Sequence, residues 1–194
     1  MPRPDVSDER KREILKAALN IFNSKGFTAA RMEDIAREAK LSVGAVYWYY
    51  KSKDDVILAI MDKVIADDMA VMKQLLNETG TVRQRLIKYL QEGAQEGIVY
   101  LPLTYELYTL AQRNAKVRHH IQKHIAHYHD ALAEIIQQGI QRGEIRKVNS
   151  QVVATTLSAL YEGALELAML DSKNIDVTKT LTQSVNIIFD GIAT

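Results

Sequence analysis

Residues 31–53 read RMEDIAREAKLSVGAVYWYYKSK, and this stretch decides how the rest of the chain is interpreted. Its apolar residues follow helical spacing over 32–39, and a second short helix is expected over 43–49. Ser42 is placed to cap the second helix through its hydroxyl. Two short helices joined by a tight turn are typical of a helix-turn-helix, whose second helix enters the major groove of DNA.

Four consecutive aromatic residues, Tyr47 to Tyr50, close the second helix, and Lys51 and Lys53 follow them. A helix turns by about 100° per residue, so four neighbouring rings cannot all face one core. Some of these rings must therefore point outward, which favours a binding surface. For the helix pair taken alone, an ordinary helical corner with aromatic core residues is the alternative.

The composition is that of a soluble globular protein, with 194 residues, 47% hydrophobic, 25% charged and a net charge of +1. This length allows one or two domains with a substantial core. The absence of cysteine excludes a disulfide framework, thiolate metal sites and a cysteine nucleophile. The N-terminus has no apolar signal core, and no uninterrupted apolar run approaches the ~18 residues that span a bilayer. A cytoplasmic protein without membrane contact is therefore expected.

Positive charge gathers at the N-terminal end. Residues 1–53 hold 11 Lys and Arg against 7 Asp and Glu, whereas residues 54–194 hold 14 against 17. A basic head on a mildly acidic body is what a DNA-binding module joined to a second functional part should look like.

The rest of the chain is expected to be helical throughout. Helical spacing and capping signals delimit nine helices with short connections, and no internal repeat is present. The expected ranges are 8–25, 32–39, 43–49, 52–77, 82–97, 102–113, 115–142, 150–170 and 176–192. An all-α bundle is the economical fold for such a set. The helix over 52–77 is long enough to connect the N-terminal domain with the remainder.

With these residues in view, the N-terminal third resembles the TetR family of transcriptional regulators. Type and spacing agree at an aromatic after a helix-ending glycine, an Asp-Ile-Ala run, a Ser-x-Gly, an aromatic pair and a following lysine. These are Gly26-Phe27, Asp34-Ile35-Ala36, Ser42-Val43-Gly44, Tyr47 with Tyr49 and Tyr50, and Lys51 with Lys53. The resemblance implies a nine-helix TetR-like architecture. Its DNA-binding domain would span 8–68 (helix-turn-helix 31–50), and its ligand-binding and dimerisation domain would span 69–194.

Two positions depart from the family pattern. Arg31 stands where the family often has Ser or Thr at the start of the second helix, which leaves capping to Thr28 or to water. Lys40 stands in the turn where glycine is common, and a left-handed lysine costs roughly 1 kcal/mol. Neither departure threatens the fold.

The expected DNA face combines small, aromatic and basic residues. Gly44 and Ala45 let the helix backbone approach the groove, while Val43 and Ala45 are able to pack on thymine methyl groups. Lys53 opens the helix over 52–77, where positive charge and free N–H groups would face a phosphate. The resemblance places Tyr47 and Trp48 among the DNA contacts. The full set is Thr28, Arg31, Ser42, Val43, Gly44, Ala45, Tyr47, Trp48, Tyr49 and Lys53, whereas Val46 and Tyr50 are assigned to the core.

Apolar residues on the helices over 150–170 and 176–192 exceed what one packing partner needs. Two such helices form a four-helix bundle with a symmetry mate, and the resemblance implies the same homodimer. A dimer on a palindrome places its two heads about one helical turn (~34–36 Å) apart. Burial of both helices within one chain is the alternative.

All five histidines fall within residues 119–129, and three of them share one helical face. A histidine pair at i, i+4 suits zinc or nickel, but only Asp130 is near enough to extend the set, so no metal site is expected. Aromatic walls with a few polar groups instead point to a small-molecule pocket for an unknown effector. The candidate pocket residues are Tyr100, Tyr105, Tyr108, His120, His124, His127, Tyr128 and Tyr161. The same residues also suit a helical core with polar-tipped aromatics.

The resemblance implies a homodimeric repressor that an effector releases from a palindromic operator on double-stranded DNA. A constitutive or activating DNA-binding regulator without an effector is the second interpretation. An all-α enzyme or metal-binding protein that uses the histidine helix is the third. Paired carboxylates, a glycine-rich phosphate loop and a nucleophile–base set are all missing from the sequence, so neither enzymatic activity nor a cofactor is expected.

Overall fold

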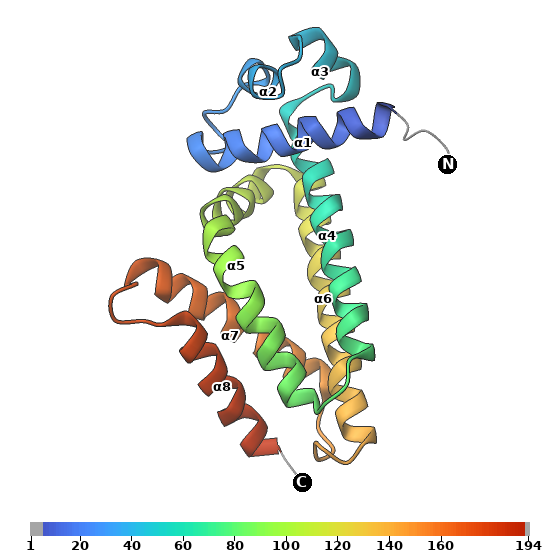
Figure 1. Cartoon of the computed structure of the whole chain (residues 1–194), viewed down its shortest axis with the longest axis vertical. Coiled ribbons are helices and arrows are strands. Elements are labelled where there is room, and N and C mark those ends of the chain that lie inside the picture. The colour runs from blue at the N-terminus through green and yellow to red at the C-terminus, as the bar shows by residue number, and fades with distance from the viewer. Residues whose placement is uncertain (1–5, 193–194) are drawn as a thin grey trace. The chain divides into compact units, whose positions relative to one another are not determined.

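The computed structural model describes residues 6–192, and every element assigned within them is an α-helix (Figure 1). The helices are α1 (Val6–Lys25), α2 (Met32–Glu38), α3 (Val43–Tyr49), α4 (Lys53–Asn77), α5 (Val82–Arg113), α6 (Ala115–Gln141), α7 (Ser150–Leu170) and α8 (Val177–Ile192). The predicted all-α class and its helix-turn-helix are confirmed. Residues 193–194, the end of the expected regulatory domain, lie outside the described range.

The segments expected as separate helices over 82–97 and 102–113 both lie in α5, which contains Pro102. Proline has no N–H, so it offers no hydrogen bond to the carbonyl of Ile98 four residues earlier. The helix therefore continues through a position where one backbone hydrogen bond of the regular pattern is missing.

Most helix starts are capped by a side chain that directly precedes the helix, as the sequence predicted for Ser42. At α3, for example, the amide of Ala45 donates to Ser42 Oγ at 3.1 Å. Each cap accepts from amides that have no partner within the helix. The caps seen are Ser42, Ser52, Thr81 with Gln84, Asn114, Asn149 and Asp176.

Contacts divide the chain into two compact units. The first unit comprises the described residues up to Ile65 together with Pro102–Ile121, and the second comprises Ala66–Leu101 and the described residues from Gln122 onward. Helices α4, α5 and α6 each run from one unit into the other without interruption. Residues 102–121, which the sequence placed with the regulatory domain, thus pack with the helix-turn-helix.

The first unit is built around a small core shared by α1 to α4 and the C-terminal part of α5. Phe22, Ile35, Val46 and Ile57 are fully buried in it. The rings of Phe22 and Phe27 meet edge to face, with centroids 5.2 Å apart. Burial of Val46 agrees with its predicted inward position, and this core fixes α2 and α3 against α1.

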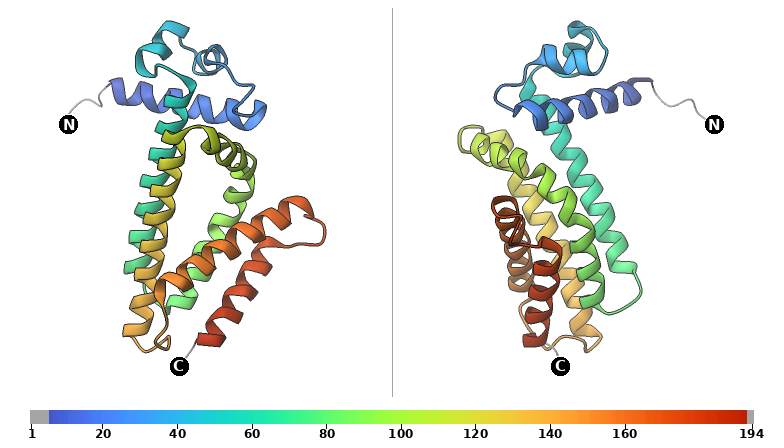
Figure 2. Two further views of the ribbon diagram at one scale, coloured as in Figure 1. Left: turned by 180° about the vertical axis from the view of Figure 1, so that it is seen from behind. Right: turned by 60° about the vertical axis from the view of Figure 1, so that its left-hand side comes forward.

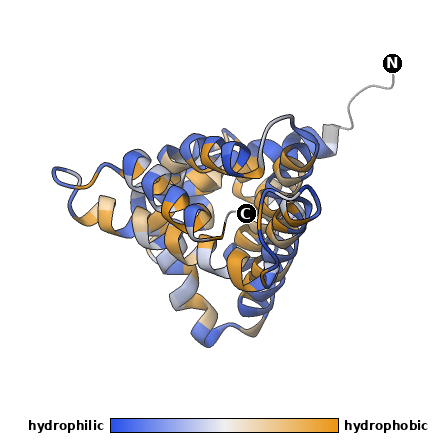
Figure 3. Ribbon diagram, turned by 90° about the horizontal axis from the view of Figure 1, so that it is seen from below, coloured by the Kyte–Doolittle hydropathy of each residue, from blue (hydrophilic) through white to orange (hydrophobic). Residues whose placement is uncertain are grey.

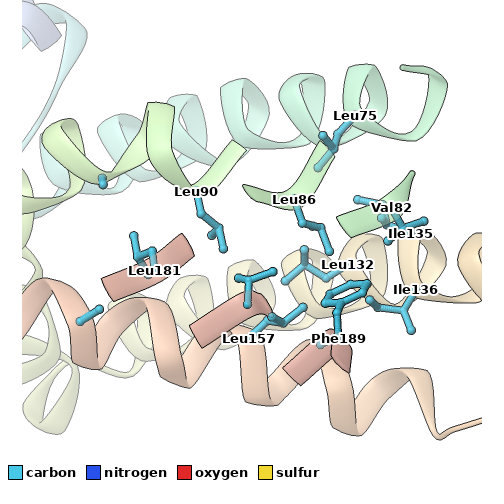
Figure 4. Packing of buried hydrophobic residues seen from close by; sticks show 14 of the residues in the cluster. Leu75, Val82, Leu86, Leu90, Leu132, Ile135, Ile136, Leu157, Leu181 and Phe189 are labelled. Atoms are coloured by element: carbon cyan, nitrogen blue, oxygen red, sulfur yellow. The ribbon is translucent and has the colours of Figure 1, made fainter. Parts of the chain in front are cut away.

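The second unit has the larger core, in which side chains from several helices point toward one another (Figure 4). Leu86 of α5, Leu132 of α6, Leu157 of α7 and Phe189 of α8 are all buried there. Helices α7 and α8 lie side by side (Figure 2). Hydrophobic and hydrophilic residues alternate along the helices, as expected of helices that bury one side in a core (Figure 3).

Helix α5 meets α7 at a glycine in the second unit. A Cβ atom on Gly97 would lie 2.6 Å from Tyr161 Oη and 2.8 Å from Leu165 Cδ1, closer than real atoms approach. The Tyr161 hydroxyl donates to the carbonyl of Gly93 at 3.0 Å. Gly97 is therefore required for the close approach that lets Tyr161 reach the α5 backbone.

Candidate nucleic-acid interface

The turn between α2 and α3 depends on Lys40, whose φ of 56° lies in the left-handed region. Its conformation allows the amide of Leu41 to donate to the carbonyl of Ala36 at 2.9 Å, which closes the end of α2. The sequence predicted this conformation at a cost of roughly 1 kcal/mol. The turn fixes the direction in which α3 leaves α2.

The start of α2 is held by Asp34, a role that the sequence did not reveal. Its carboxylate accepts from the backbone amide of Arg31 at 3.2 Å, from Lys25 Nζ at 2.8 Å and from the Arg37 guanidinium. The hydrogen bond from Lys25 is the chief reason why the pKa of Asp34 lies below its ordinary value. Asp34, rather than Thr28, thus satisfies the amide at this helix start.

Helix α3 presents one continuous face to solvent. Val43 is 36% exposed, Tyr47 40% and Trp48 69%, and Gly44 has open space on its Cα side. These four residues occupy an arc of about 140° on a helical projection. The opposite side carries the buried Val46. Val43, Gly44, Tyr47 and Trp48 are therefore accessible together, whereas Ala45 and Tyr49 of the predicted set are only partly exposed.

Tyr49 and Tyr50 differ from their outward neighbours. Tyr49 packs partly on the core of the first unit, and its ring meets that of Trp48 edge to face with centroids 4.6 Å apart. Tyr50 is half-buried against the same core, and this burial raises the pKa of its phenol. Tyr49 thus supports Trp48 from below, while Tyr50 has the core position expected for it.

Lys53 does not offer its ammonium to solvent as the sequence predicted. Its Nζ donates to the carbonyls of Thr28 at 3.1 Å and Ala30 at 2.9 Å, and also to the carbonyl of Phe27. It also lies 4.5 Å from the centroid of the Phe27 ring, and partial burial lowers its pKa. Three carbonyl acceptors use the three N–H bonds of the ammonium. Lys53 therefore ties α4 to the turn between α1 and α2.

Glu106 of α5 holds the same turn from another side, and no motif pointed to it. Its Oε2 accepts from the backbone amide of Thr28 at 3.2 Å. Gly26 has a φ of 78°, and a Cβ there would lie 2.6 Å from Glu106 Oε1. A cleft of about 330 Å³ opens beside this contact. Its lining is Phe27, Thr28, Lys53, Tyr105, Glu106, Thr109, Leu110 and Arg113.

The residues predicted to line an effector pocket are divided between the two units. Tyr105, Tyr108 and His120 belong to the first unit, and Tyr100, His124, His127, Tyr128 and Tyr161 to the second. In the second unit, the hydroxyls of Tyr128 and Tyr89 lie 3.2 Å apart, and burial raises the pKa of both. Tyr89 was missed because nothing in its sequence surroundings sets it apart from a core tyrosine.

The histidines of α6 contact aspartates of α4. His120 Nε2 lies 3.3 Å from Asp62 in the first unit, and His124 Nε2 lies 3.5 Å from Asp68 in the second. His124 Nδ1 is buried without a hydrogen-bond partner. Within residues 6–192, no three His, Asp or Glu side chains come together as a metal site would require.

Acidification is expected to destabilise the second unit through His124. Burial lowers the pKa of His124 and His127 acts in the same direction, while the carboxylate of Asp68 lies 3.5 Å from its Nε2. A lowered pKa means that the unfolded chain binds the proton more readily. The stability contributed by neutral His124 is thus present above a pH of about 6.5 and is lost as the pH falls below it.

The variant His124→Phe tests this by thermal unfolding between about pH 7.5 and pH 5. It is expected to lose less stability on acidification than the parent protein. His119→Phe, an exposed position on the same helix, serves as the control and is expected to follow the parent. Equal pH dependence of the His124 variant and the parent would contradict the assignment.

Two family models match the parts of the chain whose geometry is given above. The family "Bacterial regulatory proteins, tetR family" matches residues 14–60, and "Tetracyclin repressor-like, C-terminal domain" matches residues 102–183. The chain belongs to the TetR family. It is therefore a DNA-binding transcriptional regulator, and the solvent-facing side of α3 belongs to the helix-turn-helix of that family.

Some relatives match most of the length of this TetR-family chain. The HTH-type transcriptional regulator YfiR of Bacillus subtilis (strain 168) is 26% identical over 178 residues, which cover 88% of this chain and 86% of YfiR. A transcriptional regulator from Saccharomonospora viridis in complex with choline superposes with a TM-score of 0.83 at 22% identity, over 96% of this chain and 99% of that one. FadR from Bacillus subtilis in complex with stearoyl-CoA superposes with a TM-score of 0.78 at 19% identity. The match covers 93% of this chain and 98% of FadR. The structural likenesses establish the TetR fold.

Proposed function

We propose that this regulator is a homodimeric repressor that binds a palindromic operator and leaves it when a small molecule binds the second unit. The observation that carries the proposal is the outward face of α3, which is accessible on a helix-turn-helix held rigidly by Asp34, Lys40 and Lys53. Basic residues flank this face, since Arg31, Arg37, Lys40 and Lys51 are all exposed. They are suited to phosphate contacts that position the helix.

Dimerisation is supported by the apolar residues that α7 and α8 leave exposed. Val152 is 60% exposed, Leu167 54%, Leu170 70% and Ile187 72%. Helix α7 is long and apolar enough to cross a membrane by length and composition alone. Only 33% of its most apolar 18 residues are buried within one chain, so much of this apolar surface is left uncovered. A second copy of the chain would cover this surface in a four-helix bundle.

Regulation of transcription requires access to the chromosome, which supports a cytoplasmic location rather than a membrane one.

An effector is proposed because two proteins of the same fold have been solved with small molecules, namely choline and stearoyl-CoA. In this chain the second unit offers a polar group of tyrosine hydroxyls and an imidazole within an apolar core. The group consists of Tyr89, His124, Tyr128 and Tyr161. Polar atoms of this kind inside an apolar core orient small ligands in other proteins.

Leu167→Glu tests the dimer and the operator together. The charge is expected to separate the dimer, measured by analytical ultracentrifugation, and to weaken binding to a two-half-site duplex by at least about tenfold. Binding to a single half-site should be unchanged. Val71→Glu, an exposed valine of α4, is the matched control. A monomeric parent protein that binds one half-site as tightly as two would contradict the proposal.

The effector is tested on the operator complex of the parent protein by fluorescence anisotropy. Choline and stearoyl-CoA are titrated first, because proteins of the same fold bind them. Release of DNA by a compound that also raises the melting temperature of the free protein supports ligand-controlled repression. A DNA affinity that no compound from a broad metabolite set changes would instead indicate a constitutive regulator.

A further inference from the structure

The outward face of α3 carries few groups that form hydrogen bonds. The helix reads VGAVYWY, without Arg, Lys, Asn, Gln, Asp or Glu. Its solvent-facing arc is formed by Val43, Gly44, Tyr47 and Trp48, with the methyl group of Ala45 at its edge. A phenol or an indole has a single hydrogen-bond donor, whereas a side chain that distinguishes guanine or adenine well supplies two hydrogen bonds at fixed geometry.

Two of the basic residues near α3, Lys51 and Arg37, are engaged in contacts with other groups of the first unit. Lys51 Nζ donates to the carbonyls of Tyr47 at 3.0 Å and Trp48 at 3.4 Å, at the C-terminal end of the helix. Arg37 pairs with Asp34 on α2. The Ser42 hydroxyl oxygen accepts from the amide of Ala45. These contacts leave the base-facing arc to the apolar and aromatic side chains.

Only one feature of the major-groove edges is satisfied by apolar contact, and that is the 5-methyl group of thymine. Val43 and Trp48 are large, apolar and 36% and 69% exposed, and Tyr49 supports the Trp48 ring edge to face. Gly44 carries no side chain between them, so a base edge is able to approach the helix backbone there. Burial of these side chains against methyl groups removes apolar surface from water on both sides.

We propose that α3 reads its operator through thymine methyl groups, so that each half-site has T·A or A·T pairs beneath Val43 and Trp48. The inference rests on the insertion of α3 into the major groove, which belongs to the proposed function. It adds the chemical class of the bases that are read and the two side chains that read them. Phosphate contacts from the basic flanks would supply affinity without sequence preference.

The test begins with selection of duplexes from a random library by the full-length protein. Thymine is expected in each half-site at two or more positions of the selected palindrome. Each of these thymines is then replaced singly by deoxyuridine, which lacks only the 5-methyl group. Each replacement under α3 is expected to weaken binding about fourfold, the effect of one methyl-sized apolar group. At the same position, a C·G pair with 5-methylcytosine should bind more tightly than one with cytosine.

Protein variants identify the side chain that meets each methyl group. Trp48→Ala and Val43→Ala are each expected to weaken binding to the thymine operator and to bring the thymine-to-deoxyuridine ratio close to one at their own position. Val64→Ala, an exposed valine of α4 in the same unit, is the matched control and should keep both affinity and ratio. Thermal melting of each variant separates loss of fold from loss of contact.

The outcomes distinguish this inference from the function beneath it. Selective binding to a palindrome without any deoxyuridine effect, or with G·C pairs at the positions sensitive to Trp48→Ala, overturns thymine reading and leaves the regulator intact. Failure to select any duplex overturns the proposed operator binding itself, and thymine reading with it.

Discussion

Replacing Lys53 with Met is expected to lower the free energy of unfolding by about 2 kcal/mol and to weaken operator binding by up to about 30-fold. The ammonium bonds three carbonyls of the turn between α1 and α2 and lies over the ring of Phe27. Methionine has similar length but no donor, so three acceptors lose a charged partner. The turn would then hold α2, and through it α3, less firmly. Urea unfolding and operator titration measure the two effects.

The salt dependence of binding separates this role from a phosphate contact. Loss of one phosphate contact would reduce the slope of log affinity against log salt by about 0.9 and leave folding stability unchanged. Loosening of the turn between α1 and α2 would instead lower the folding stability and leave the salt slope unchanged. Lys51→Met is the contrasting variant, because Lys51 is exposed and bonds only the end of its own helix. It is expected to leave folding stability unchanged and to reduce the salt slope. Unaltered stability of Lys53→Met combined with a reduced salt slope would restore the interpretation made from sequence.

Replacing Arg85 with Met is expected to cost about 3 kcal/mol, a large share of the 5–15 kcal/mol typical of a folded domain. Arg85 is only 2% exposed, and its Nη1 donates to the carbonyl of Leu75 at 2.6 Å and to that of Leu76 at 3.2 Å. Its Nη2 donates to Gln138 Oε1 at 2.5 Å. Burial is the main reason why the pKa of Arg85 is lowered. Methionine fills similar space but leaves the last carbonyls of α4 without this donor.

The matched control is Arg83→Met, two residues earlier on α5. Arg83 pairs with Asp190 at 2.7 Å, but the Asp190 side chain is 68% exposed, so water screens the interaction. A loss of at most about 1 kcal/mol is expected there. Chemical unfolding monitored by circular dichroism measures both variants. A similar small loss for Arg85→Met would mean that the α4 carbonyls find water or other donors, and the buried guanidinium would then contribute little net stability.

Local chemistry made the helix-turn-helix predictable from its residues. A hydroxyl residue directly before an apolar helical run usually caps the helix, which predicted that Ser42 caps α3. In the structure, the amide of Ala45 donates to Ser42 Oγ. Lys40 adopts the left-handed conformation that the resemblance implied for its position in the turn. Val46 is buried because it lies on the side of α3 that packs in the same core as Ile35 and Ala36. Each of these choices depends on residues within a few positions along the chain.

Distant contacts were the part that the residue pattern did not predict. Lys53 meets carbonyls about 25 residues earlier, and Glu106 meets the amide of Thr28 across 78 positions. A lysine at a helix start suits a phosphate or a carbonyl equally well, and only the fold decides which is nearer. The same holds for the predicted pocket. The sequence shows that aromatic and histidine residues with polar groups lie on helical faces. It does not show which of the two compact units each of them belongs to.

The proline within α5 sets this helix apart mechanically from α4 and α6. A continuous helix resists bending because its hydrogen bonds must stretch. Of these helices, α5 alone contains a proline, so near Ile98 it has one hydrogen bond fewer to strain. We therefore expect α5 to be the most compliant of the three rods. Glu106 lies one turn beyond Pro102 and contacts the turn between α1 and α2, so we expect a deflection of α5 to reach that turn first.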